Sequence, residues 1–375
     1  MSRVTSLFGR WTQELQFLVD TNLEALKQPF FPRYFRMGTP KNSLTYATAI
    51  GTSRIEAAAS VVEHGSEAPL RSRAGLELLH GKIASIKVKR KMDEQEYREW
   101  LAMQNLSTLD DNAKNQAIQL IWDDIKYVAD SVSSRLDIMA AQALSKGIIS
   151  VNTTTNPDGV VHGDIDLLVT NKIASDAFTN STSANRVWTL DKKASATPIA
   201  DIQYLTRKAW MDNGVMFGRI LMTPEKFWIL QACTEVQNLL KGFNGITNGE
   251  FSPSLGNINA YLAANDLPII ELVNVRAKIE SDGKLTTLDP WADKKYITFV
   301  PDGDLGIIHN AFAIEQIAPV PNVDYATVNN TLVSKWSQTE PFGEFTRGEI
   351  AAFPGLEAAD QMYIVNTEHQ DDFDG

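Results

Sequence analysis

The feature that most constrains the fold is a long amphipathic segment from Ala113 to Lys146. Apolar residues recur along it at helical spacing, and no glycine or proline interrupts them. The apolar positions are Ile118, Ile121, Trp122, Ile125, Val128, Ala129, Val132, Leu136, Met139, Ala140, Ala143 and Leu144. The opposite face holds Asp123, Asp124, Lys126, Asp130, Ser134 and Asp137. At about 1.5 Å per residue this helix would be roughly 50 Å long, far above the usual length, so we expect it to support the architecture.

Length and composition favour a multidomain protein with a sizeable core. The 375 residues predict two to three domains, and 43% of them are hydrophobic. No apolar run approaches the ~20 residues that span a bilayer, and the charged N-terminus does not resemble a signal peptide. The single cysteine, Cys233, excludes an intrachain disulfide. It lies in an apolar helical run, which favours a buried, inert thiol in a reducing compartment.

Charge is divided unevenly along the chain. Residues 1–91 hold 14 Lys/Arg and 7 Asp/Glu, whereas the remaining residues hold 21 and 39, for a net charge of −11. A basic arm on an acidic body can bind nucleic acid, or it can lie on the acidic body of a neighbouring subunit. Because the arm has no RNA-binding signature and no interleaved aromatic residues after Tyr46, we favour the second interpretation.

The first 91 residues do not look able to fold alone. Two prolines within an aromatic cluster, Pro29 to Phe35, predict an extended segment packed on another surface. Residues 43–91 are β-like and end in the basic stretch Lys87–Lys91, but their middle is too polar for a core. We therefore expect a long two-stranded excursion, which is unstable in water unless it finds a surface.

After the long helix, the pattern changes to strands and then to an α/β arrangement. Gly147 ends the helix, and the turn at residues 156–159 predicts a hairpin over residues 147–170. Helices are expected from Pro198 and from Thr223 through Leu240, and strands at 216–222, 269–275 and 296–300. Residues 301–375 read as short β pieces followed by a mobile acidic tail from Glu368.

No catalytic chemistry is visible in the sequence. No two of the five histidines lie at metal-ligand spacing, and no phosphate-binding glycine loop, dinucleotide fingerprint or nucleophile elbow occurs. The carboxylate pair Asp123 and Asp124 reads as a solvated helix face. We therefore assign no catalytic, cofactor-binding or metal-binding residue, predict no cofactor, and expect the chain not to be an enzyme.

These parts follow one another in a specific order. The order is an apolar arm, a polar excursion, a long helix, a hairpin, an α/β domain and a strand-rich return. Five stretches carry a likeness within it: 30–35, 61–73 with 87–91, 296–306, 344–355 and 363–365. The chain resembles the major capsid proteins of tailed phages, which have the Hong Kong 97 fold, and most closely the phage lambda type.

The resemblance implies an α+β fold of named parts. These are an N-terminal arm (1–42), a long β-hairpin called the E-loop (43–91), a peripheral domain (92–197 and 311–375) and an axial α/β domain (198–310). The peripheral domain would include a spine helix at about 108–146. The implied function is assembly of hexamers and pentamers into an icosahedral phage head that encloses double-stranded DNA without binding it specifically. The implied location is the virion capsid, assembled in the bacterial host cytoplasm without a membrane, and portal, scaffolding and decoration proteins are the further partners.

The resemblance also suggests which residues contact a neighbouring subunit. The candidates are Phe30, Phe31, Tyr34, Phe35, Arg71, Arg73, Lys87, Lys89, Arg90 and Lys91. In a strand, Lys87, Lys89 and Lys91 share one face, and Val88 and Arg90 the other. We expect Lys87, Lys89, Arg90 and Lys91 to bind acidic residues of the neighbour; the alternative is a solvated strand edge that lysine protects from aggregation.

Two other functions stay open at the level of sequence. The first is the shell of an encapsulin-like bacterial nanocompartment with the same fold. The second is a two-domain α/β enzyme whose active site lies at the strand ends of the α/β domain.

Overall fold

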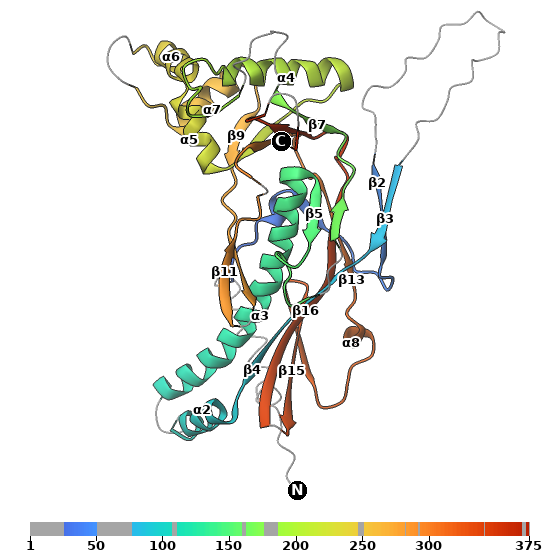
Figure 1. Ribbon diagram of the computed structural model, residues 1–375. Helices are drawn as coiled ribbons and strands as arrows, with labels where there is room; N and C mark the ends of the chain where they lie inside the picture. The colour runs from blue at the N-terminus through green and yellow to red at the C-terminus, as the bar shows by residue number, and fades with distance from the viewer. Residues whose placement is uncertain are drawn as a thin grey trace, which may run out of the picture.

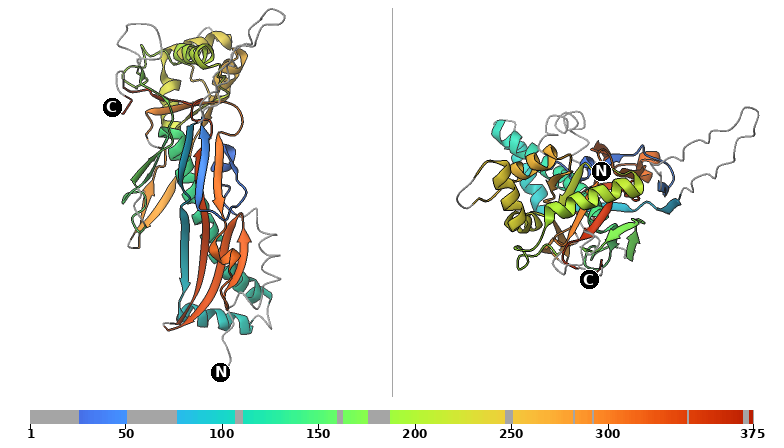
Figure 2. Two further views of the ribbon diagram at one scale, coloured as in Figure 1. Left: turned by 90° about the vertical axis from the view of Figure 1, so that its right-hand side faces the viewer. Right: turned by 90° about the horizontal axis from the view of Figure 1, so that it is seen from above.

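The computed structural model shows an elongated molecule with a helix-rich head at one end and a long twisted sheet running to the other (Figures 1 and 2). It describes residues 26–50, 77–106, 111–159, 163–175, 187–246, 251–281, 283–291, 293–340, 342–369 and 373–374.

The predicted long helix is confirmed as α3 (Asp111–Lys146). It follows α2 (Glu94–Leu106) and lies along the body against β16 (Phe342–Leu356). Its apolar face is buried from Trp122 onward, with Ile125, Val128 and Leu144 fully enclosed. The close approach of α3 to β16 requires a glycine at position 348, because a Cβ at Gly348 would lie 2.9 Å from the Cβ of Val128. The helix therefore serves as the support on which the sheet is built.

A six-stranded sheet forms the body and combines segments from both ends of the chain. Its main path is β1-β13-β16-β15-β14, and β4 pairs with β16 off this path. Residues 344–349 of β16 have β15 on one side and β4 on the other, and residues 351–356 pair with β13. The other strands are β1 (Phe35–Met37), β4 (Ser85–Met92), β13 (Gly306–Ala311), β14 (Asp324–Val328) and β15 (Thr331–Thr339). The sequence had indicated short β pieces where the structure has the 15-residue strand β16.

The excursion is shorter than the range 43–91 assigned to the E-loop. Strands β2 (Thr45–Ile50) and β3 (Glu77–Lys82) form the expected antiparallel pair, but the basic stretch that follows belongs to β4 in the body sheet. The reason is that β16 offers β4 an antiparallel edge along which Lys87 lies directly opposite Glu349. Residues 51–76 lie outside the described part of the chain.

The head has the α/β character expected for residues 198–310. Helices α4 (Pro198–Asn213), α5 (Pro224–Ala232), α6 (Thr234–Phe243) and α7 (Leu255–Ala264) lie in this region. The head sheet has the order β7-β17-β12-β8-β9. Its strands are β7 (Asn171–Ile173), β8 (Arg219–Met222), β9 (Ile269–Leu272), β12 (Tyr296–Val300) and β17 (Tyr363–Asn366). Two of these strands, β7 and β17, come from segments assigned to the peripheral domain, so head and body share one continuous framework.

Two hairpins flank this framework. The predicted hairpin after α3 is confirmed as β5 (Ile148–Val151) paired with β6 (Gly163–Asp166). The turn expected after Ser281 joins β10 (Ala277–Ser281) to β11 (Lys284–Leu288). The remaining short elements are the 3-10 helix η2 (Phe31–Arg33) and helix α8 (Ile314–Ile317).

Two local expectations are wrong. The helix predicted through Cys233 breaks there: Cys233 is extended, and the Thr234 amide donates to the carbonyl of Lys193, 2.9 Å away. The tail is anchored where it is described, because Glu368 lies 2.7 Å from the Nζ of buried Lys226 and the Phe373 carbonyl accepts from Tyr296. Both differences arise from partners distant in sequence, which a local pattern does not contain.

Candidate assembly surfaces

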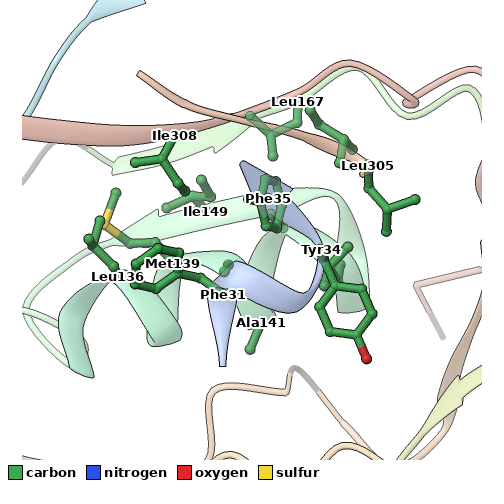
Figure 3. Close-up of a cluster of buried hydrophobic side chains, with 14 of the residues drawn as sticks. Phe31, Tyr34, Phe35, Leu136, Met139, Ala141, Ile149, Leu167, Leu305 and Ile308 are labelled. Carbon is green, nitrogen blue, oxygen red and sulfur yellow. The ribbon is translucent and has the colours of Figure 1, made fainter. Parts of the chain in front are cut away.

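The aromatic arm packs inside its own subunit. Phe30, Phe31, Tyr34 and Phe35 are all buried, and their neighbours include Leu136 and Met139 of α3 and Ile308 of β13 (Figure 3). These four side chains are thus covered within their own subunit, and their contact with another subunit stays a prediction. The apolar face of α3 supplies, within the same chain, the surface that the arm needs.

A carboxylate inside α3 holds the arm in place. Oδ1 of Asp137 accepts hydrogen bonds from the amides of Phe30 (2.7 Å) and Phe31 (3.1 Å), and its Oδ2 lies 3.3 Å from the Nζ of Lys27. Burial raises the pKa of Asp137 despite these donors. The sequence had placed Asp137 on the solvent face. The sequence signal that could have predicted its burial is its position between the apolar residues Leu136 and Ile138, which are both buried in the structure.

Tyr46 and Thr48 of the β2–β3 hairpin contact His309 and Phe353 of the body, and we name these four residues the hairpin root. The ring of Tyr46 stacks on the rings of His309 (4.8 Å between centroids) and Phe353 (5.1 Å). The hydroxyl of Thr48 lies 2.7 Å from Nε2 of His309. Burial raises the pKa of Tyr46 to about 12, and burial together with the charge of Lys41 lowers the pKa of His309. The sequence analysis named Tyr46 but gave it no role, and it missed His309.

The basic strand β4 has the predicted alternation of faces. Val88 and Arg90 face α3, where Arg90 lies 3.2 Å from Asp124. On the other face, Lys87 lies 2.7 Å from Glu349 and Lys89 lies over the ring of Phe345. The expected acidic partners of Lys87 and Arg90 are thus supplied within the chain, and Asp124 is buried instead of solvated. Contact of Lys89 and Lys91 with a neighbour stays a prediction.

An ionic chain leads from β4 across the sheet. Glu349 bridges Lys87 and Arg347, and Arg347 reaches Glu315 of α8 at 2.6 Å. Burial disfavours the charge on Glu315, but the hydrogen bond from Arg347 and the charges of Arg347 and Lys87 outweigh it and lower its pKa. The strand that leaves the hairpin is thereby tied to α8 on the far side of β16. Arg71 and Arg73, the remaining candidates, lie outside the described residues.

This architecture can be compared with known proteins. The family model for phage major capsid protein E matches residues 21–363, which is most of the chain. The chain belongs to this family.

The capsid protein also resembles a solved structure described as a prophage capsid protein from E. coli CFT073. The identity is 14%, the TM-score is 0.54, and the likeness covers 95% of this chain and 98% of that one. The mature capsid of bacteriophage PhiM1 is 11% identical with a TM-score of 0.45, covering 91% and 87% of the two chains. None of the curated proteins matches. The capsid protein thus has the Hong Kong 97 fold predicted from the order of its parts, and its likeness to the lambda type stays a prediction.

Other groups in the capsid protein have structural roles. Cys233 is buried, and burial raises the pKa of its thiol to about 11, as expected for an inert thiol. Within the described ranges, no three His, Cys, Asp or Glu side chains gather as metal ligands would. In the same part of the chain, no helix is both long and apolar enough to cross a bilayer.

Proposed function

We propose that this capsid protein assembles as hexamers and pentamers into an icosahedral phage head that encloses double-stranded DNA. The family match gives the role of major capsid protein. The observation that carries the proposal is the construction of the subunit: a two-stranded hairpin whose described residues Tyr46 and Thr48 join it to the body at the hairpin root. A two-stranded ribbon has too little core of its own to be stable in water, so a neighbouring subunit is its natural support.

The charge distribution supports this arrangement. The residues after 91 carry 21 Lys/Arg and 39 Asp/Glu, so the body is strongly acidic. An acidic wall encloses DNA without holding it, because the phosphate backbone is repelled instead of bound. The same acidic body attracts Lys89 and Lys91 of β4 from neighbouring subunits.

Further partners follow from the same proposal. Assembly takes place in the bacterial host cytoplasm, with a scaffolding protein, a portal at one vertex and decoration proteins outside as candidate partners. The family match favours this phage head over the encapsulin-like nanocompartment, since the matching model is that of a phage major capsid protein.

Nuclease protection tests the function directly. The protein is produced in its phage context, and particles are separated by sedimentation and treated with nuclease. We expect fast-sedimenting particles that contain this chain in many copies and protect genome-length DNA. A chain found only as a monomer or dimer, with scaffold and portal present, contradicts the proposal.

A further inference from the structure

A short apolar segment stands out on the surface of the body. Residues 312–320, here named the apolar projection, connect β13 to β14 and include α8 (Figure 1). Ile314 is 66% exposed and Ile317 is 55% exposed, and Phe312 and Val320 are also exposed. A concentration of large apolar side chains on so short a segment marks an interaction surface.

The apolar projection is held in one conformation. The amide of Val320 donates to the hydroxyl of Tyr325 (3.1 Å), the amide of Ala318 donates to the carbonyl of Ile314 (2.8 Å), and Arg347 binds Glu315. A pre-ordered surface loses little conformational entropy when a partner binds. The ionic chain through Arg347 and Glu349 therefore fixes the position of the projection relative to β4.

The charge of the apolar projection favours a copy of itself as the partner. Glu315 is its only ionisable residue, and that carboxylate is neutralised within the subunit by Arg347. Two such segments can meet without like-charge repulsion. The exposed Trp210 and Met211 of α4 differ, because they lie in a stretch with Arg207, Lys208 and Asp212.

Two hollows are lined in part by residues of the apolar projection. One, of about 320 Å³, combines apolar residues such as Ala313 and Ala351 with polar ones such as Asn310 and Glu349. The other, of about 480 Å³, combines Pro319 and Leu332 with Gln316 and Thr327. Both fall in the size range of small-molecule sites, about 300–1,000 Å³. The segment has protruding side chains and hollows next to each other. Copies of the chain related by a rotation axis can therefore each place protruding side chains in the hollow of the next copy and close a ring.

We infer that the apolar projection is a contact between copies of this chain, in which Ile314 and Ile317 of one subunit occupy a hollow beside the same segment of the next. The inference rests on the proposed assembly into shells and specifies one of its contacts.

Cross-linking tests the contact, because the chain has one native cysteine and Cys233 is buried with a raised pKa. An Ile317→Cys variant is assembled into shells and treated with a short bismaleimide. We expect covalent oligomers of the chain from shells and none from unassembled subunits. The matched control is Leu285→Cys on β11, where the leucine is 64% exposed and lies outside the projection; we expect no oligomers from it.

Assembly of serine variants gives a second readout. Ile314→Ser with Ile317→Ser should raise the subunit concentration needed for assembly about tenfold or more, whereas Leu285→Ser should not. Thermal unfolding of the unassembled subunits, unchanged between these variants, shows that the effect lies in assembly. Shells that form normally with both serines, or that give no cross-link at position 317, overturn this inference and leave the proposed function standing. If the wild-type chain forms no shells, both fall.

Discussion

Oδ1 of Asp137 lies 2.7 Å from the backbone nitrogen of Phe30, so a carboxylate within the long helix α3 holds the start of the aromatic arm. The amide of Phe31 donates to the same oxygen. Two backbone donors that would otherwise be buried without partners are thus satisfied by one side chain. The segment around Phe30 and Phe31 is thereby fastened to α3 of its own subunit.

Removal of this carboxylate should destabilise the subunit. Asp137→Ala leaves the amides of Phe30 and Phe31 unpaired in the core, at an expected cost of about 2–4 kcal/mol in the free energy of unfolding. Denaturant unfolding of the unassembled subunit measures this cost. The matched control is Asp130→Ala on the same helix, which loses only the more exposed bond to the Lys27 amide and should cost under about 1 kcal/mol. Equal effects at the two positions would show that the arm is not held through Asp137.

The hairpin root should be intolerant of a single added methyl group. A Cβ at Gly81 of β3 would lie 2.6 Å from the Tyr46 hydroxyl, and the Tyr46 ring is held by stacking on His309 and Phe353. We expect Gly81→Ala to cost about 1–3 kcal/mol. In a Tyr46→Leu background the same change should cost clearly less, which a double-mutant cycle measures. Additive costs would mean that the clash is relieved elsewhere.

The hairpin root should also respond to pH. Burial and the charge of Lys41 lower the pKa of His309 below its usual 6.5, so the unfolded chain takes up a proton that the folded chain does not. The stability that depends on neutral His309 is therefore fully present above pH 6.5 and is lost as the pH falls through 6.5 toward the lowered value. His309→Gln, which keeps a polar partner for Thr48, removes this titration. Thermal unfolding between pH 5 and 8 should show the wild type losing stability relative to the variant on acidification; parallel curves would contradict the prediction.

The lysines of β4 that pair with no carboxylate in the described part of the chain are predicted to act between subunits. Lys89 lies over Phe345, and Lys91 is exposed. Changing both to Gln should slow assembly and weaken its dependence on ionic strength, since contacts between exposed charges are screened by salt. Lys278→Gln with Lys284→Gln on the β10–β11 hairpin is the control of equal charge. Light scattering at low and high salt compares them, and indistinguishable curves would favour the edge-protection role of these lysines.

Local patterns predicted the elements better than their partners. The helix ending at Lys146 follows from apolar spacing, and the start of α5 follows from Thr223 and Pro224, because the Thr223 hydroxyl accepts from the amide of Lys226. Period-two alternation placed Val88 and Arg90 on one face of β4. It could not show that β4 pairs with β16, since strand pairing is decided by segments more than 250 residues apart.

The candidate contact residues show the same limit. An aromatic cluster with two prolines indicates a segment that packs on a surface, but it does not say whose surface. In this chain Phe35 is buried in one cluster with residues of α3 and β13 of the same subunit. Likewise, the sequence does not indicate that the helix breaks at Cys233. The cause is a hydrogen bond from the Thr234 amide to the carbonyl of Lys193, which lies in a loop distant in sequence.

The central claim is that this chain builds a closed shell from pentamers and hexamers. Electron microscopy of the assembled protein tests this claim most directly. The protein is produced with its scaffold and portal, and the particles are imaged and averaged. The account predicts closed icosahedral shells whose capsomers are pentamers and hexamers, with density from each β2–β3 hairpin lying over the adjacent subunit. Particles without pentamers and hexamers, or hairpins that lie only on their own subunit, would contradict it.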